Sequence, residues 1–253
     1  YPNRPVRLVV PYAPGGGTDI LGRAVASKVS ERLGQQIVVD NRAGGGTIVG
    51  TDIVAKSAPD GYTMLMNSVA MIINPSLHAK LPFDVQRDFA PVMMVATLPN
   101  ILVVHPSLPV RTVRELLDHA KAKPGTLNFG SSGAGGLGHL AGELLRFSAG
   151  IDIAHVPYRG GGPLAVDLIA GQVQMSFASL PSVLQFIRAG RLRAIAVPTA
   201  KRSRALPEVP TFTEAGIAGF EASNWQGIYL PAKTPAAIVT RLNDELRKIG
   251  RAH

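Results

Sequence analysis

Short apolar runs alternate with helical patterns along most of this chain of 253 residues. The runs at 7–12 and 36–40 are short and mostly apolar, which predicts strands. Residues 18–33 repeat apolar side chains at helical spacing, with Thr18 as the predicted N-cap. Because buried strands separated by helices favour a parallel sheet covered on both faces, the pattern predicts an α/β fold.

A second set of alternating segments begins near residue 100, with strands predicted at 101–105 and 127–130. Between them, Thr112 and Glu115 have the spacing of a capping box, which predicts the start of a helix. A last helix is expected after Thr234. We therefore expect two domains, each a mostly parallel sheet flanked by helices: domain 1 from residues 1–99 plus 225–253, and domain 2 from residues 100–224.

The composition excludes several classes of function. With no cysteine, the chain has no thiol nucleophile, thiolate zinc site or iron–sulfur cluster. The formal net charge is +9, but the basic residues are scattered and the only dense run is 201–204, so we expect no nucleic-acid partner. The histidines lack metal-ligand spacing, and we predict neither a metal site nor a cofactor.

Glycine runs join predicted strands to predicted helices at 15–17, 44–46 and 160–162. Glycine leaves backbone N–H groups uncovered, and a helix that begins at such a join adds the positive end of its dipole. Each join can be merely a tight turn. Their repetition in one chain favours binding of a carboxylate or phosphate.

A fourth join, Gly133–Gly138, matches the dinucleotide fingerprint, which leaves a nucleotide-binding enzyme as an alternative. The ribose-binding acid is missing from the end of the next strand, because the nearest candidate, Asp152, lies at its start. The neighbouring Gly130–Ala134 departs from the nucleophile elbow at its last position, and we predict no catalytic residue.

Several motifs in order then identify a resemblance. The stretches 11–19, 39–46, 58–63 and 155–161 resemble the Bug or TctC family, the extracytoplasmic solute-binding proteins of tripartite tricarboxylate transporters. The resemblance implies a two-domain periplasmic binding protein of the Venus-flytrap type, with the ligand in the interdomain cleft and no enzymatic activity. It also implies that backbone groups of two facing loops hold a ligand carboxylate. The residues implied to bind the ligand are Ala13, Pro14, Gly15, Gly16, Gly17, Thr18, Asp19, Ser68, Ser131, Ser132, Gly133, Ala134, Gly136, His139, Tyr158, Gly161 and Ala178.

The implied function is capture of a small organic carboxylate, either a di- or tricarboxylate, an acidic amino acid or an aromatic acid. The implied partners are the large and small integral membrane subunits of the transporter, and we expect a periplasmic monomer whose signal peptide is absent from this sequence. A binding protein that feeds a membrane kinase is a further alternative. Two departures matter: many relatives carry a polar or acidic residue at Ala178, and relatives continue beyond the last predicted helix, so domain 1 is expected to be truncated.

Overall fold

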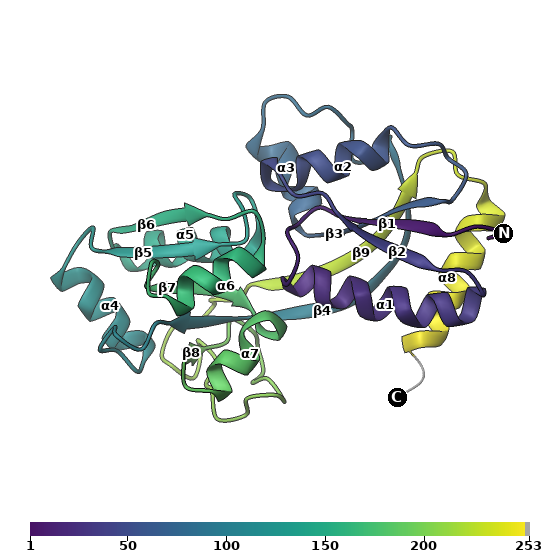
Figure 1. The fold of residues 1–253 in the computed structure, drawn as a ribbon. Coiled ribbons are helices and arrows are strands. Elements are labelled where there is room, and N and C mark those ends of the chain that lie inside the picture. Colours follow the sequence, from purple (N-terminus) through teal and green to yellow (C-terminus); the bar gives the residue numbers. More distant parts are fainter. Residues whose placement is uncertain (251–253) are drawn as a thin grey trace. The chain divides into compact units, whose positions relative to one another are not determined.

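The computed structural model describes residues 1–250, so the last three residues of the predicted domain 1 lie outside the described residues. The chain forms two compact units (Figure 1). Unit 1 comprises residues 1–14 and 18–97 together with the chain from residue 225, and unit 2 comprises residues 15–17 and 98–224. Two strands, β4 and β9, pass from one unit into the other.

Unit 1 has a mixed sheet with the strand order β2-β1-β3-β9-β4. Strands β2 and β3 pair with β1 in parallel, and β9 pairs with β3 in the antiparallel direction. Its elements are β1 (Val6–Val10), α1 (Gly17–Leu33), β2 (Ile37–Asn41), η1 (Gly45–Thr47), α2 (Ile48–Ala55), β3 (Thr63–Ser68), α3 (Ala70–Leu77), the first part of β4 (Phe89–Val104), the last part of β9 (Ser223–Pro231) and α8 (Ala236–Gly250).

Helices cover both faces of the unit 1 sheet (Figure 1). Leu8 of β1 packs with Val29 of α1 and Leu242 of α8, whereas its neighbour Val9 packs with Met71 of α3. Successive side chains of a strand point to opposite faces, so a strand covered on both faces is largely apolar. This explains why β1 is apolar except at the half-buried Arg7.

Unit 2 repeats the architecture with the strand order β4-β7-β5-β6, and β8 pairs with β4. Strands β6 and β7 both run parallel to β5, and β4 is antiparallel to β7. Its further elements are α4 (Val113–Ala122), β5 (Leu127–Ser131), α5 (Leu137–Ala149), β6 (Ile153–Pro157), α6 (Gly161–Ile169), β7 (Met175–Ser179), α7 (Leu180–Arg188) and β8 (Arg193–Ala196).

Two apolar clusters hold unit 2 together, one on each face of its sheet. On one face, Phe129 of β5 packs with Leu116 of α4 and Leu145 of α5. On the other face, Ile101 of β4 packs with the helices α6 and α7. Both units therefore have the predicted α/β class.

Three expectations from the sequence need correction. Strand β4 begins at Phe89 and continues through Pro99, whereas the sequence predicted a strand only over 101–105, because a proline removes only one hydrogen-bond donor from a strand. Helix α3 was not predicted. Thr18 lies inside the first turn of α1 and does not precede it, since α1 begins at Gly17. The predicted capping box is confirmed: the side chain of Thr112 accepts from the N–H of Glu115 at 3.1 Å.

Candidate functional site

Three helices of unit 2 begin at one edge of its sheet, and none has a side-chain cap. Because β5, β6 and β7 are parallel, the helices that follow them start at the same edge. Their N-cap residues are Gly136 for α5, Gly160 for α6 and Ser179 for α7, and no side chain of these residues accepts a capping hydrogen bond. The edge thus gathers uncapped N–H groups and the positive ends of three helix dipoles, which suits an anion.

The glycine run 15–17, which belongs to unit 2, packs at this edge of the sheet. A Cβ placed on Gly16 would lie 3.0 Å from the backbone nitrogen of Gly161, and one placed on Gly17 would lie 2.1 Å from the Ser179 Oγ. Backbone therefore meets backbone at Gly16, whereas Gly17 lies against the side chain of Ser179. Pro14 and Gly15 are exposed, and Ala13 is half-buried.

The loop from Ser131 to Gly136 joins β5 to α5 and contains two glycines with positive φ, at 147° for Gly133 and 76° for Gly135. Ser131 is fully buried, and its Oγ accepts from the N–H of Gly133 at 3.3 Å. Ser132 is half-buried and Ala134 is exposed. Ser131 therefore shapes the loop from within, while Ser132 and Ala134 reach its surface.

Two other predicted site residues of unit 2 differ in what surrounds them. Tyr158 donates its N–H to the Ser131 carbonyl at 2.9 Å, and its hydroxyl donates to Asp167 at 2.8 Å. Burial, together with the neighbouring Asp167 carboxylate, raises the pKa of Tyr158 to about 12. Ala178 is 3% exposed and lies in an apolar cluster with Ile101. The structure thus brings Tyr158 to the Ser131 loop and places Ala178 within the core.

In unit 1, Tyr12 follows β1 and meets Ser68, the last residue of the strand β3. Their hydroxyl oxygens are 2.6 Å apart, and both side chains are buried. Burial raises the pKa of Tyr12 to about 12, although the hydrogen bond to Ser68 acts in the opposite direction. Ser68 also accepts from the N–H of Ala70 at 3.2 Å, so it supports the start of α3.

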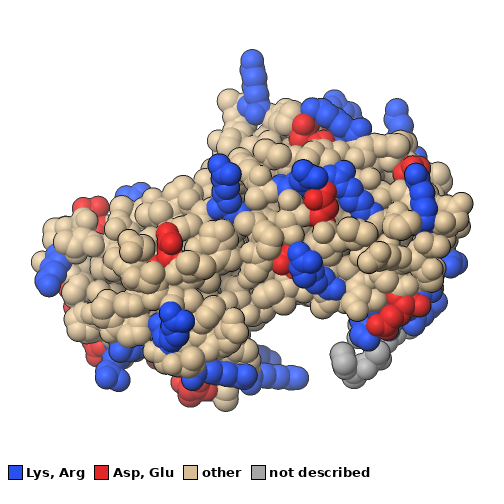
Figure 2. All heavy atoms as spheres, in the orientation of Figure 1, with Lys and Arg blue, Asp and Glu red and all other residues tan. Residues whose placement is uncertain are grey.

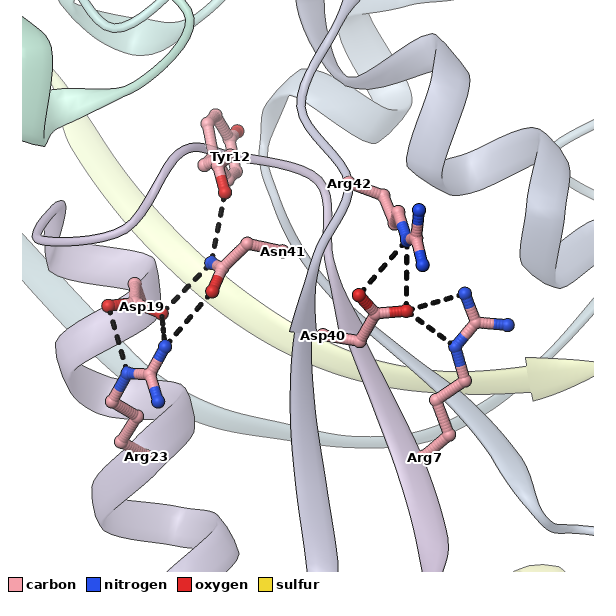
Figure 3. Close-up of polar contacts among 7 residues, drawn as sticks. All are labelled: Arg7, Tyr12, Asp19, Arg23, Asp40, Asn41 and Arg42. Carbon is pink, nitrogen blue, oxygen red and sulfur yellow. Dashed lines mark hydrogen bonds and ion pairs between the residues drawn. The ribbon is translucent and has the colours of Figure 1, made fainter.

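Asp19 is 3% exposed in the first turn of α1 and belongs to a network of hydrogen bonds (Figure 3). It accepts from Arg23 Nε at 3.1 Å and from Asn41 Nδ2 at 2.9 Å. Asn41 also donates to the Tyr12 carbonyl at 3.0 Å. The guanidinium of Arg23 balances the charge of Asp19, so this carboxylate ties the loop after β1 to the end of β2 without presenting an isolated negative charge.

A second carboxylate, Asp40, lies between two arginines of unit 1 (Figure 3). Burial acts to raise its pKa, but hydrogen bonds from Arg42 at 3.0 Å and Arg7 at 2.7 Å outweigh burial and lower it. Asp40 therefore stays ionised. Both arginines are engaged with it, so neither is an isolated positive charge at the end of β2.

Comparisons with known proteins identify the family of this chain. The family model described as "Tripartite tricarboxylate transporter family receptor" (TctC) matches residues 21–252. The chain belongs to this family. Among curated proteins, it is 45% identical to the UPF0065 protein in the tcbD-tcbE intergenic region of Pseudomonas sp. strain P51, covering 98% of this chain and 74% of that protein. It is 40% identical to BugT of Bordetella pertussis, covering 98% of this chain and 77% of BugT.

Solved structures place the chain among periplasmic binding proteins with the two-domain fold. Rpa4515 of R. palustris with adipate is 39% identical, with a TM-score of 0.95 over 97% of this chain and 83% of that one. MatC of Rhodopseudomonas palustris with bound malate is 30% identical, with a TM-score of 0.92 over 98% of this chain and 85% of that one. The TctC family and these neighbours are solute-binding proteins, not enzymes.

Because members of the TctC family are solute-binding proteins, nucleotide binding does not explain the glycine pattern at Gly133–Gly138. Close packing of α5 against β7 explains it. A Cβ on Gly138 would lie 2.6 Å from the Phe177 carbonyl oxygen, so this glycine lets α5 approach β7 closely. A dinucleotide fold uses its third glycine for the same purpose. Asp152 lies before β6, at the opposite end of that strand from the loop. The glycine spacing at 133–138 therefore indicates a tight turn and a close approach of helix and sheet.

Figure 2 shows Lys and Arg spread over the face drawn, with Asp and Glu among them. Within residues 1–250, no three His, Cys, Asp or Glu side chains are grouped to hold a metal ion. No helix in the same part of the chain is long and apolar enough to cross a membrane.

Sequence reasoning missed His155, which contacts the Ser131 loop from β6. Its Nε2 lies 2.7 Å from the Ser131 Oγ, and its ring stacks on that of His139 at 4.0 Å between centroids. The two histidines are far apart in the sequence, and only the parallel pairing of β5 and β6 brings them together. The motif 155–161 gave the only signal, and it pointed to Tyr158 and Gly161.

Proposed function

We propose that this chain captures a small dicarboxylate in the periplasm and presents it to the membrane subunits of a tripartite tricarboxylate transporter. The observation that carries the proposal is the set of three uncapped helix N-termini at one edge of the unit 2 sheet, beside the glycine run 15–17. A carboxylate needs several N–H donors, and this edge offers them without a competing acidic side chain at any of the three N-caps.

The choice of a dicarboxylate draws support from the relatives. The structure at 39% identity contains adipate and the one at 30% contains malate, and both are dicarboxylates. The net charge of +9 favours anions in general. We propose that the loops 13–19, 131–136 and 158–161 bind one carboxylate of the ligand through backbone groups, with Ser132 adding a hydroxyl.

A thermal-shift screen tests the proposal against adipate, malate, citrate, glutamate and benzoate, with NAD and AMP as a competing set. A ligand at 100 times its Kd adds about 2.7 kcal/mol to the free energy of unfolding, which corresponds to a shift in Tm of roughly 5 to 11 °C. We expect adipate or malate to give the largest shift. A response to nucleotides alone would contradict carboxylate binding. Loss of uptake of the same dicarboxylate from cells that lack this protein would support the transporter partnership.

Ser132 offers a direct test of the loop. Replacing Ser132 with alanine removes a hydroxyl at the loop surface, and we expect the affinity for adipate to fall about 3- to 10-fold, the equivalent of one hydrogen bond. Ser148, exposed at the far end of α5, provides the control, because its replacement by alanine should leave the affinity unchanged. Isothermal titration calorimetry measures both. Equal affinities in the two variants would show that the Ser132 hydroxyl does not bind the ligand.

A further inference from the structure

Three aromatic rings form a stack behind the Ser131–Gly136 loop. The ring of His155, on β6, lies 4.9 Å from that of Phe129 and 4.0 Å from that of His139, with interplanar angles of 29° and 25°. Phe129 is a core residue of β5 and is fully buried. The stack therefore fixes both imidazoles against a rigid strand.

Each histidine has a nitrogen directed at one part of the loop. His139 Nδ1 accepts from the N–H of Gly135 at 3.2 Å. His155 Nε2 lies 2.7 Å from the Ser131 Oγ, which accepts from the N–H of Gly133 at 3.3 Å and donates to the Gly133 carbonyl at 3.0 Å. Both glycines that bend the loop are thus held, one directly by His139 and the other through Ser131.

These hydrogen bonds specify where protons can be. Because His139 Nδ1 is an acceptor, the proton of its neutral ring must be on Nε2, and a second proton could only go to Nδ1. That proton would face the N–H of Gly135 and break the bond. The single hydroxyl proton of Ser131 goes to the Gly133 carbonyl, so His155 Nε2 donates to the Ser131 Oγ, and a second proton on this ring would go to Nδ1 and charge it beside His139. Two positive rings at 4.0 Å would also repel each other.

We propose that His139 and His155 form a positioning pair that holds the Ser131–Gly136 loop in its ligand-binding conformation only while both rings are neutral. The statement that this loop binds ligand rests on the proposed function. The pair itself touches loop atoms, and its effect on a ligand passes through the positions of Gly133 and Gly135.

The surroundings of the pair favour the neutral rings. Burial and, to a smaller extent, the neighbouring His139 lower the pKa of His155 to about 4, and Glu143 opposes both. Burial also lowers the pKa of His139, again against Glu143. Glu143 is the acidic residue of α5 beside the pair, and it accepts from Arg146 at 2.8 Å. Strand β5 has no titratable side chain among residues 127–131.

The sign of the pH effect follows from these directions. An unfolded histidine has a pKa of about 6.5, so the unfolded chain binds protons before the folded pair does. The stability that the neutral pair contributes is complete above pH 6.5 and is lost as the pH falls toward 4. A loop held by the pair should loosen over the same window.

The first test needs no ligand. We compare the NMR amide signals of Gly133 and Gly135 in the wild type and in His155→Phe, which keeps an aromatic ring in the stack but removes the nitrogen that faces Ser131. We expect both signals to move with the imidazole signals between pH 7 and 4 in the wild type, and to be displaced at pH 7 in the variant. His119→Phe, on α4, is the control and should leave them unchanged. Unchanged Gly133 and Gly135 signals in His155→Phe would overturn the proposal.

The second test uses adipate as the probe. At pH 7, His155→Phe should bind adipate roughly tenfold more weakly than the wild type, the equivalent of one hydrogen bond, whereas His155→Gln should bind near normally because its amide replaces the bond to Ser131. Between pH 6.5 and 4, the wild type should lose affinity more steeply than His155→Gln, which does not titrate; the ionisation of adipate is common to both. Parallel pH profiles would overturn the proposal. If the wild type does not bind adipate, the proposed ligand is wrong and the loop signals alone decide for or against the pair.

Discussion

Replacement of Gly16 by valine is expected to lower the affinity for adipate on the order of 100-fold, which is the upper end of the cost of overpacking expressed as an equilibrium constant. Even a single Cβ at this position would lie 3.0 Å from the Gly161 nitrogen and 3.3 Å from its Cα. The two valine methyl groups add to that clash. The neighbour is backbone, which cannot rotate away, so the glycine runs 15–17 and 160–162 must separate and their N–H groups lose their arrangement.

Isothermal titration calorimetry measures this loss, and far-ultraviolet circular dichroism shows whether the fold is retained. Gly34→Ala is a suitable control. Gly34 follows α1 and has no atom within 4 Å of a Cβ placed on it, although its φ of 65° makes the substitution mildly strained. We expect Gly34→Ala to lose some stability and keep its affinity. Unchanged affinity in Gly16→Val would refute the role of the glycine runs.

Local patterns in the sequence predicted most of the elements in this structure. The run at 7–12, apolar from Leu8 onward, predicted β1 because a strand buried on both faces has few polar positions. The spacing of Thr112 and Glu115 predicted the start of α4, since the capping hydrogen bond depends only on residues three positions apart. These features depend only on residues within one helical turn or one strand.

The features that sequence reasoning missed depend on residues distant in the chain. His139 and His155 form a stack only because β5 and β6 pair in register, with Phe129 opposite His155. Asn41 holds Asp19 only because β1 and β2 are neighbours. The glycines of the fingerprint illustrate the converse case: their spacing was visible, but only the packing of α5 on β7 explains Gly138.

The packing of α5 on Phe129 of β5 makes Gly142 sensitive to substitution, and we expect Gly142→Ala to lower the free energy of unfolding of unit 2 by about 3 kcal/mol. A Cβ on Gly142 would lie 2.1, 2.5 and 2.7 Å from three ring atoms of Phe129. Phe129 is fully buried beneath its own stack with His155, so its ring has no free space to enter. Helix α5 must move away from the sheet, and the pair behind the loop moves with it.

The sign of the change in stability of Gly142→Ala distinguishes an effect of packing from an effect of helix propensity. Alanine is a better helix former than glycine by about 1 kcal/mol, so propensity alone predicts that Gly142→Ala stabilises the protein. Gly150→Ala gives the matched control at the C-cap of the same helix, where φ is 61° and no atom lies within 4 Å of the added Cβ. It should cost only the left-handed strain of about 1 to 2 kcal/mol. Thermal unfolding followed by circular dichroism ranks the two variants, and a Gly142→Ala protein as stable as the wild type would show that α5 does not rely on this close approach.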